Sequence, residues 1–164
     1  GSVNLCLSAN IQELFNSSCQ WLWQTGKNYY DDVVKLVPGP FRTKISVHAF
    51  IDRMELAFAA ADVIISRAGA GTISELCLVG KPVILVPSPN VAEDHQTKNA
   101  LALVALDAAV MIPDDRAGSS LIDEAVNLVA DEARKKILSE NISKMAVRDA
   151  DMKIAREVMK LVER

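Results

Sequence analysis

The sequence predicts an α/β fold with one Rossmann-like parallel sheet and flanking helices. Short apolar runs of strand length alternate with segments of helical periodicity, which is typical of parallel β–α–β units. One such run, Val63–Ile65, leads into the tight turn Gly69–Gly71 and then a helix. Half of the 164 residues are hydrophobic, enough for the core of one domain. We therefore expect residues 1–164 to form a single domain with right-handed crossovers.

The elements follow in order from these signals. Apolar residues on one side of a helical pattern predict a helix over residues 3–16. The run Trp21–Trp23 predicts a strand over residues 20–24, which ends at the turn Thr25-Gly26. The remaining expected strands are 45–50, 63–65, 83–86 and 109–112. The remaining expected helices are 29–36, which Pro38-Gly39-Pro40 stops, 54–61, 72–79 and 96–106. From Ser119 the pattern predicts a helical C-terminal tail with breaks near Asp131 and Asp149.

Composition excludes several classes of protein. The net charge of −3 does not favour a nucleic-acid partner. Cys6, Cys19 and Cys77 lack metal-ligand spacing, so we expect buried thiols in a reducing cytosol and no metal site. We also expect no cofactor. No apolar run has the roughly 20 residues needed to span a bilayer.

The turn at residues 69–71 has the chemistry of an anion site. Glycine permits positive φ and a close ligand approach, and the first amides of the following helix lack intrahelical acceptors. The helix dipole favours an anion there, typically a phosphate, and Thr72 adds a hydroxyl donor. Thr72 and Glu75 also fit a capping box, and a plain turn is a further alternative. Ser74 replaces the third glycine of the dinucleotide fingerprint, which disfavours NAD.

Taken together, the motifs between residues 21 and 114 resemble the carboxyl-terminal domain of the MurG family of UDP-N-acetylglucosamine transferases in peptidoglycan synthesis. The matching blocks are Phe50-Ile51-Asp52-Arg53-Met54, Ala60-Ala61-Asp62-Val63, Ser66 to Glu75, Gly80-Lys81-Pro82, Val86-Pro87 and Asp94 to Ala100. The resemblance implies one half of a GT-B glycosyltransferase and UDP-N-acetylglucosamine (UDP-GlcNAc) as the donor. It implies a protein of the cytoplasm that is peripheral on the inner face of the membrane.

The resemblance also assigns the parts of the donor to residues. Phe50, Ile51 and Met54 match the uracil site, although without the resemblance they would be ordinary core residues. Ala70, Gly71 and Thr72 match the diphosphate-facing turn, and Glu75 matches the carboxylate that accepts both ribose hydroxyls. The sugar-side matches are His95, Gln96 and Asn99, where Asn99 could instead hold the loop and His95 could be merely solvated. Arg67 is expected to anchor the turn.

Some parts of the family's fold and site have no counterpart in this sequence. The family's first strand, its Gly-Gly-Ser loop and its N-terminal acceptor domain do not match any part of this sequence. No catalytic residue is therefore expected here, the lipid I acceptor would bind the other domain, and the isolated domain would be inactive. In the strand order 3-2-1-4-5-6 the unmatched strand is central. We expect either direct pairing of Trp21–Gln24 with Val63–Ile65 or a partner segment between them.

Two other functions stay open at this point. A non-hydrolysing UDP-GlcNAc 2-epimerase would share the nucleotide pocket but needs carboxylates at the sugar ring. A non-catalytic nucleotide-binding module needs only the pocket. A homodimer through the exposed face of the last helix is a further expectation.

Overall fold

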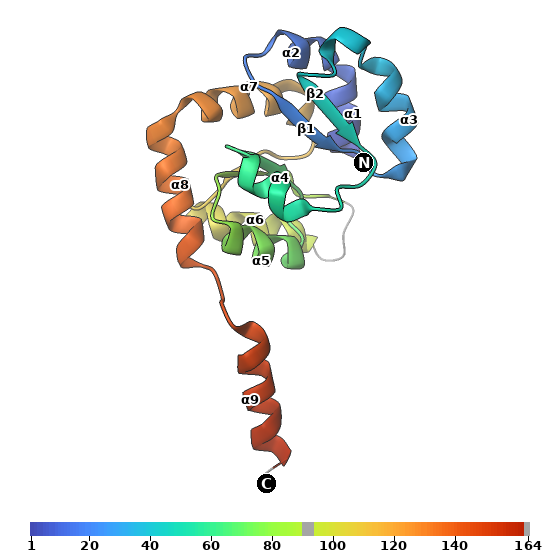
Figure 1. Cartoon of the computed structure of the whole chain (residues 1–164). Coiled ribbons are helices and arrows are strands. Elements are labelled where there is room, and N and C mark those ends of the chain that lie inside the picture. The colour runs from blue at the N-terminus through green and yellow to red at the C-terminus, as the bar shows by residue number, and fades with distance from the viewer. Residues whose placement is uncertain (90–93, 163–164) are drawn as a thin grey trace.

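The computed structural model describes residues 1–89 and 94–162 and contains parallel strands flanked by helices (Figure 1). The strands are β1 (Trp21–Gln24), β2 (Ile45–His48), β3 (Ile64–Ser66), β4 (Val83–Leu85) and β5 (Val110–Met111). The helices are α1 (Ser2–Ala9), α2 (Ile11–Asn16), α3 (Lys27–Leu36), the 3-10 turn η1 (Gly39–Phe41), α4 (Met54–Ala60), α5 (Ala70–Val79), α6 (His95–Ala105), α7 (Ala117–Ala130), α8 (Glu132–Lys144) and α9 (Ala150–Val162). The predicted α/β class and each predicted strand are confirmed, and the tail breaks at residues 131 and 145–149 as expected near Asp131 and Asp149.

The prediction of one continuous helix over residues 3–16 is wrong. Residues 3–16 form α1 and α2, which meet at Asn10 with φ −108° and ψ 29°. The Asn10 Nδ2 atom donates to the carbonyls of Cys6 and Gly118, at 3.0 and 2.9 Å. Asparagine side chains compete in this way with the helical backbone, and the second bond ties the break to α7.

The strands form two sheets rather than one. β1 pairs with β2, and β3–β4–β5 form a separate parallel sheet. The break between the two sheets, β2-β1 and β3-β4-β5, lies where the 3-2-1-4-5-6 order would place the unmatched strand. The prediction of direct pairing between Trp21–Gln24 and Val63–Ile65 is therefore wrong. A partner segment in that position stays a prediction.

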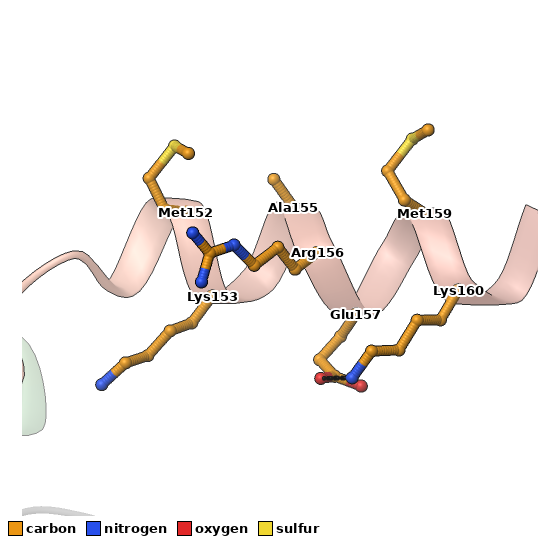
Figure 2. A pocket seen from close by; sticks show the side chains of 7 residues that line it. All are labelled: Met152, Lys153, Ala155, Arg156, Glu157, Met159 and Lys160. Carbon is orange, nitrogen blue, oxygen red and sulfur yellow. Dashed lines mark hydrogen bonds and ion pairs between the residues drawn. The ribbon is translucent and has the colours of Figure 1, made fainter.

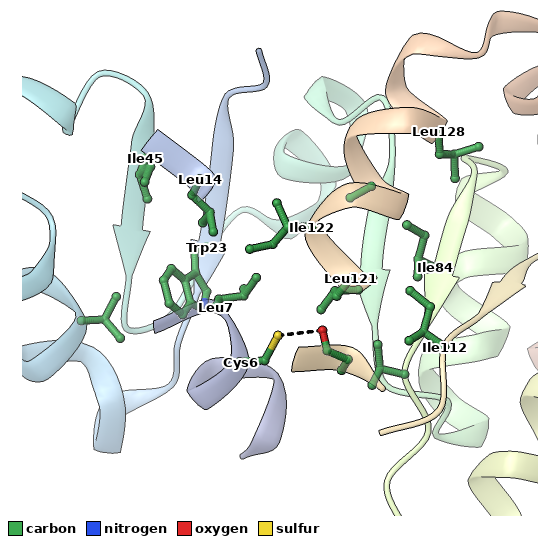
Figure 3. Packing of buried hydrophobic residues seen from close by; sticks show 14 of the residues in the cluster. Cys6, Leu7, Leu14, Trp23, Ile45, Ile84, Ile112, Leu121, Ile122 and Leu128 are labelled. Carbon is green, nitrogen blue, oxygen red and sulfur yellow. Dashed lines mark hydrogen bonds between the residues drawn. The ribbon is translucent and has the colours of Figure 1, made fainter. Parts of the chain in front are cut away.

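The core spans both sheets (Figure 3). Alternate residues of β4 point to opposite faces of its sheet. Ile84 belongs to a cluster with Trp23 and Ile45 of the other sheet, together with residues of α1, α2 and α7. Val83 and Leu85 pack instead with α5, α6 and Ile142 of α8. Shared packing, without backbone pairing, holds the two sheets together.

The three cysteines are free thiols, and the predicted burial is confirmed for Cys6 and Cys77, whereas Cys19 is only half-buried. Burial raises the pKa of the Cys6 and Cys77 thiols, which keeps them protonated at neutral pH. The Cys6 thiol donates to the Ala117 carbonyl at 3.1 Å and so joins α1 to α7. Within residues 1–89 and 94–162, no helix is both long and apolar enough to cross a membrane.

Candidate functional site

The predicted site lies beyond the carboxyl ends of β3 and β4, where α5 and α6 begin. Gly69 precedes α5 with φ −68°, and no side chain caps this helix. The first bond of the helix runs from the Ile73 amide to the Gly69 carbonyl, at 2.9 Å. The amides of Ala70, Gly71 and Thr72 precede that bond and have no acceptor in the described chain. These three residues are the ones predicted to face a diphosphate.

The capping-box alternative for Thr72 and Glu75 is wrong. The helix begins at Ala70, two residues earlier than predicted, so Thr72 is its third residue instead of its cap. Glu75 lies one turn further along α5, is exposed, and has no hydrogen bond or ion pair with the residues that the structure describes. Its carboxylate is therefore available to a ligand beside the free amides.

The glycines contribute space, not an unusual backbone conformation. Neither Gly69 nor Gly71 has a positive φ, although positive φ was one reason to expect glycine in this turn. A Cβ atom placed on Gly71 would meet no neighbouring atom of the described residues within 4 Å. Because Gly71 is exposed, the space beside its amide is open to a ligand.

The residues predicted to face uracil are not core residues. β2 ends at His48, two residues earlier than predicted, so Phe50 and Ile51 lie in the loop that leads to Met54, the first residue of α4. Phe50 is 65% exposed, and Ile51 and Met54 are half-buried. The Ile51 amide donates to Oε1 of Gln24 at 2.8 Å. Sequence reasoning missed Gln24, although its place at the end of β1 puts it on the same sheet edge.

The residues predicted to face the sugar begin α6. Asp94 precedes the helix with φ 54°, and His95, its first residue, is exposed. Gln96 and Asn99 are half-buried, and both side chains bond to Ala68 in the turn before α5. The structure therefore brings these two residues to the diphosphate turn. The loop residues 90–93, which precede this helix, lie outside the described residues.

Arg67 anchors the turn, as predicted. Its guanidinium donates to the Val86 carbonyl at 3.0 Å and to the Asp114 carboxylate at 2.5 Å, and it also contacts the Ser2 hydroxyl. Burial would raise the pKa of Asp114, but hydrogen bonds from Ser2 and Arg67 and the Arg67 charge outweigh it and lower that pKa. Asp114, which sequence reasoning did not single out for this role, thus stays ionised and holds Arg67 in place.

A separate hollow runs along α9 (Figure 2). Seven residues of this one helix line it: Met152, Lys153, Ala155, Arg156, Glu157, Met159 and Lys160. Met152 and Met159 lie on one side of the helix in Figure 2, and the Glu157–Lys160 ion pair, at 2.6 Å, lies on the other. Because no second element contributes to it, the hollow is the surface of a projecting helix and does not enclose a ligand.

Comparison with known proteins gives one family. The glycosyltransferase family 28 C-terminal domain matches residues 2–154. A protein of Parabacteroides distasonis named UDP-N-acetylglucosamine--N-acetylmuramyl-(pentapeptide) pyrophosphoryl-undecaprenol N-acetylglucosamine transferase is 48% identical over 99% of this chain. Its namesake from Bacteroides thetaiotaomicron is 54% identical over 94%. The chain spans 44% and 41% of the lengths of these two relatives.

Solved structures show the same fold. The crystal structure of MurG from Acinetobacter baumannii superposes with a TM-score of 0.80 at 22% identity, covering 95% of this chain and 46% of that one. The glycotransferase of kitacinnamycin superposes with a TM-score of 0.59 at 22% identity, covering 87% of this chain and 33% of that one. The GT-B half predicted from the sequence is therefore confirmed as the fold.

Proposed function

Because the chain belongs to the glycosyltransferase family 28 C-terminal domain family, we propose that it is the donor-binding half of a UDP-GlcNAc-dependent transferase. The whole enzyme would transfer N-acetylglucosamine to lipid I and form lipid II. The curated relatives that cover 94–99% of this chain carry names for this reaction, which supports the proposal. The whole enzyme would work in the cytoplasm, on the inner face of the membrane.

The observation that carries the proposal is the start of α5. Three consecutive amides, of Ala70, Gly71 and Thr72, have no acceptor among the described residues, and the exposed Glu75 carboxylate lies on the next turn of the same helix. Amides and the helix dipole suit the diphosphate, which is the leaving group of the transfer. A carboxylate accepts two hydrogen bonds at once and suits the two ribose hydroxyls.

The base and the sugar would lie on either side of this centre. Phe50 offers an exposed ring for the uracil, and the half-buried Ile51 and Met54 border it. On the other side, His95, Gln96 and Asn99 of α6 would meet the sugar. Gln96 and Asn99 would each have one side-chain atom left for the sugar, because Gln96 binds Ala68 and Ser88 through Oε1 and Asn99 binds Ala68 through Nδ2.

Calorimetric titration with UDP and UDP-GlcNAc tests the proposal. We expect both ligands to bind, and Glu75→Ala to weaken both by about 1.5–3 kcal/mol through loss of hydrogen bonds to a charged group. Glu157→Ala is the matched control, because Glu157 is also exposed and helical but lies on α9. Equal effects of the two substitutions, or no binding by the folded wild-type chain, would contradict the assignment.

We also propose that the chain alone does not catalyse the transfer. Transfer with inversion needs a base that deprotonates the acceptor hydroxyl, and no residue of this chain is assigned to that role. The expected result is no turnover of UDP-GlcNAc with a lipid I analogue under conditions in which the chain binds the donor. Measurable turnover would overturn this proposal and leave the donor site in place.

A further inference from the structure

A side chain at the end of β1 holds the loop that follows β2. The Ile51 amide donates to Oε1 of Gln24 at 2.8 Å, across 27 residues of sequence. Within residues 1–89 and 94–162, this is the one hydrogen bond that the loop residues 49–52 make. The Gln24 side chain is therefore the polar contact that ties this loop to the carboxyl edge of the sheet.

This bond is open to solvent and lies beside the ring proposed to meet the base. Gln24 is the last residue of β1 and is exposed. Phe50, the residue before Ile51, is 65% exposed. A hydrogen bond that water can reach is readily replaced by one to water or to a ligand, because its net gain in free energy is small. The Ile51 amide can therefore change partners without disturbing the fold.

The present partner of the Ile51 amide has the same chemistry as a carbonyl of uracil. Oε1 of Gln24 is an amide oxygen, and uracil carries carbonyl oxygens beside its ring N–H. Bases that stack on exposed aromatic rings are commonly bound along such an edge. The Ile51 carbonyl receives no hydrogen bond from the described residues and could accept the ring N–H. Because a residue has a single amide N–H, Gln24 and a base carbonyl would compete for it.

We propose that Gln24 occupies part of the base site in the free chain and must release the Ile51 amide before a base carbonyl can bind there. This inference rests on the proposed function, which brings the uracil of the donor to this loop. Only chains in which Gln24 has released Ile51 offer the amide, so their fraction limits the apparent affinity. Gln24 thus lowers the affinity for the donor, whereas a residue that only positioned the loop would raise it.

Calorimetric titration with UDP separates these two roles by the sign of the change. Gln24→Ala removes the competing oxygen, so we expect the dissociation constant to fall about two- to tenfold, the equivalent of one exposed hydrogen bond. Gln20→Ala is the matched control, because Gln20 is also exposed but precedes β1 at the opposite end of the strand. It should leave the affinity unchanged. An unchanged or weaker affinity in Gln24→Ala would overturn the inference while the proposed function stands.

Hydrogen exchange at the Ile51 amide follows the change of partner directly. Without ligand, this amide should exchange faster in Gln24→Ala than in wild type, and saturating UDP should protect it in both proteins. The Thr25 amide, which donates to the backbone carbonyl of His48, is the internal control and should exchange alike in all samples. An Ile51 amide that bound UDP leaves unprotected in Gln24→Ala would also overturn the inference. If neither protein binds UDP, the proposed function fails together with it.

Discussion

The guanidinium of Arg67 lies 2.5 Å from the carboxylate of Asp114, across 47 residues of sequence. Arg67 follows β3 and Asp114 follows β5, so the pair joins the two outer strands of the β3–β4–β5 sheet at the edge where the candidate site lies. The same guanidinium binds the carbonyl of Val86 beyond β4. One side chain thus fixes the carboxyl ends of all three strands.

Asp114→Asn should destabilise the chain and weaken its response to acid. Loss of the charged partner of a partly buried arginine costs about 1–3 kcal/mol in the free energy of unfolding at pH 7. Because the folded pKa of Asp114 is lowered, its contribution is complete above the unfolded value of 3.8 and is lost as the pH falls through the folded pKa. Urea titrations at pH 7 and near pH 3 should therefore show a smaller difference between wild type and variant in acid. Asp115→Asn, at the exposed neighbouring position, is the control and should cost little.

Amide hydrogen exchange should identify the two unpaired strand edges. The Thr25 amide donates to the His48 carbonyl of β2, and the Ile64 amide donates to the carbonyl of Pro82, just before β4, each at 2.9 Å. Because successive amides of a strand point to opposite sides, the amides of Leu22, Gln24 and Ile65 point away from these neighbours. The described chain offers the amides of these last three residues no acceptor. We expect them to exchange much faster than Thr25 and Ile64 in the chain alone.

A segment that fills the gap should reverse this difference. Extending the chain at its N-terminus with the preceding residues of a curated relative should slow exchange at Leu22, Gln24 and Ile65, because each would gain a strand partner. A scrambled extension of equal length is the control. Unchanged exchange with the native extension would contradict the prediction that a partner segment lies between β1 and β3.

The sequence predicts the positions of the strands well and their pairing poorly. Apolar, β-branched runs such as Val83–Leu85 mark a buried strand locally. Whether β1 and β3 pair depends on whether the packing of the two sheets can close the gap between them. No local sequence pattern contains that information. The break at Asn10 has a similar cause, because one of its two hydrogen bonds goes to Gly118 across the fold.

The sequence predicts where the candidate site residues lie in the fold better than it predicts their contacts. The Gly69–Gly71 turn and the residues after it mark a helix start, and the part of the chain that the structure describes offers the amides of Ala70, Gly71 and Thr72 no acceptor. Whether Thr72 caps the helix depends on where the helix begins, and a shift of two residues decides against it. Partners distant in sequence, such as Gln24 for Ile51 and Gln96 for Ala68, become visible only when the loops meet at the sheet edge.

Removing α9 should leave the rest of the fold intact. The helix projects from the remaining elements in Figure 1 and packs substantially against none of them. Five of its large apolar side chains are more than half exposed: Met152, Ile154, Val158, Met159 and Leu161. A chain that ends at Arg148 should keep the wild-type melting temperature within about 1 °C, since surface changes contribute little to stability. A large drop would show that α9 packs in solution.

The same truncation tests the predicted homodimer. If the apolar face of α9 associates with a second copy, sedimentation should show a concentration-dependent dimer for the full chain and a monomer for the truncated one. Ile154→Lys should also disrupt the dimer, because it places a charge on the apolar face, whereas Lys153→Ala changes the opposite face and is the control.

Gly71→Val should weaken binding of UDP without loss of fold. A Cβ atom at Gly71 meets no atom of residues 1–89 and 94–162 within 4 Å, so we expect the valine side chain to be accommodated by the fold and to occupy the space beside the free amides. Gly118 is a matched control, because it too is the second residue of a helix and has open space around its Cβ position. Valine at either position should change the melting temperature alike, by a few degrees at most. Titration with UDP should show at least a tenfold rise in the dissociation constant for Gly71→Val and none for Gly118→Val. Equal affinities for the two variants would place the diphosphate away from the start of α5.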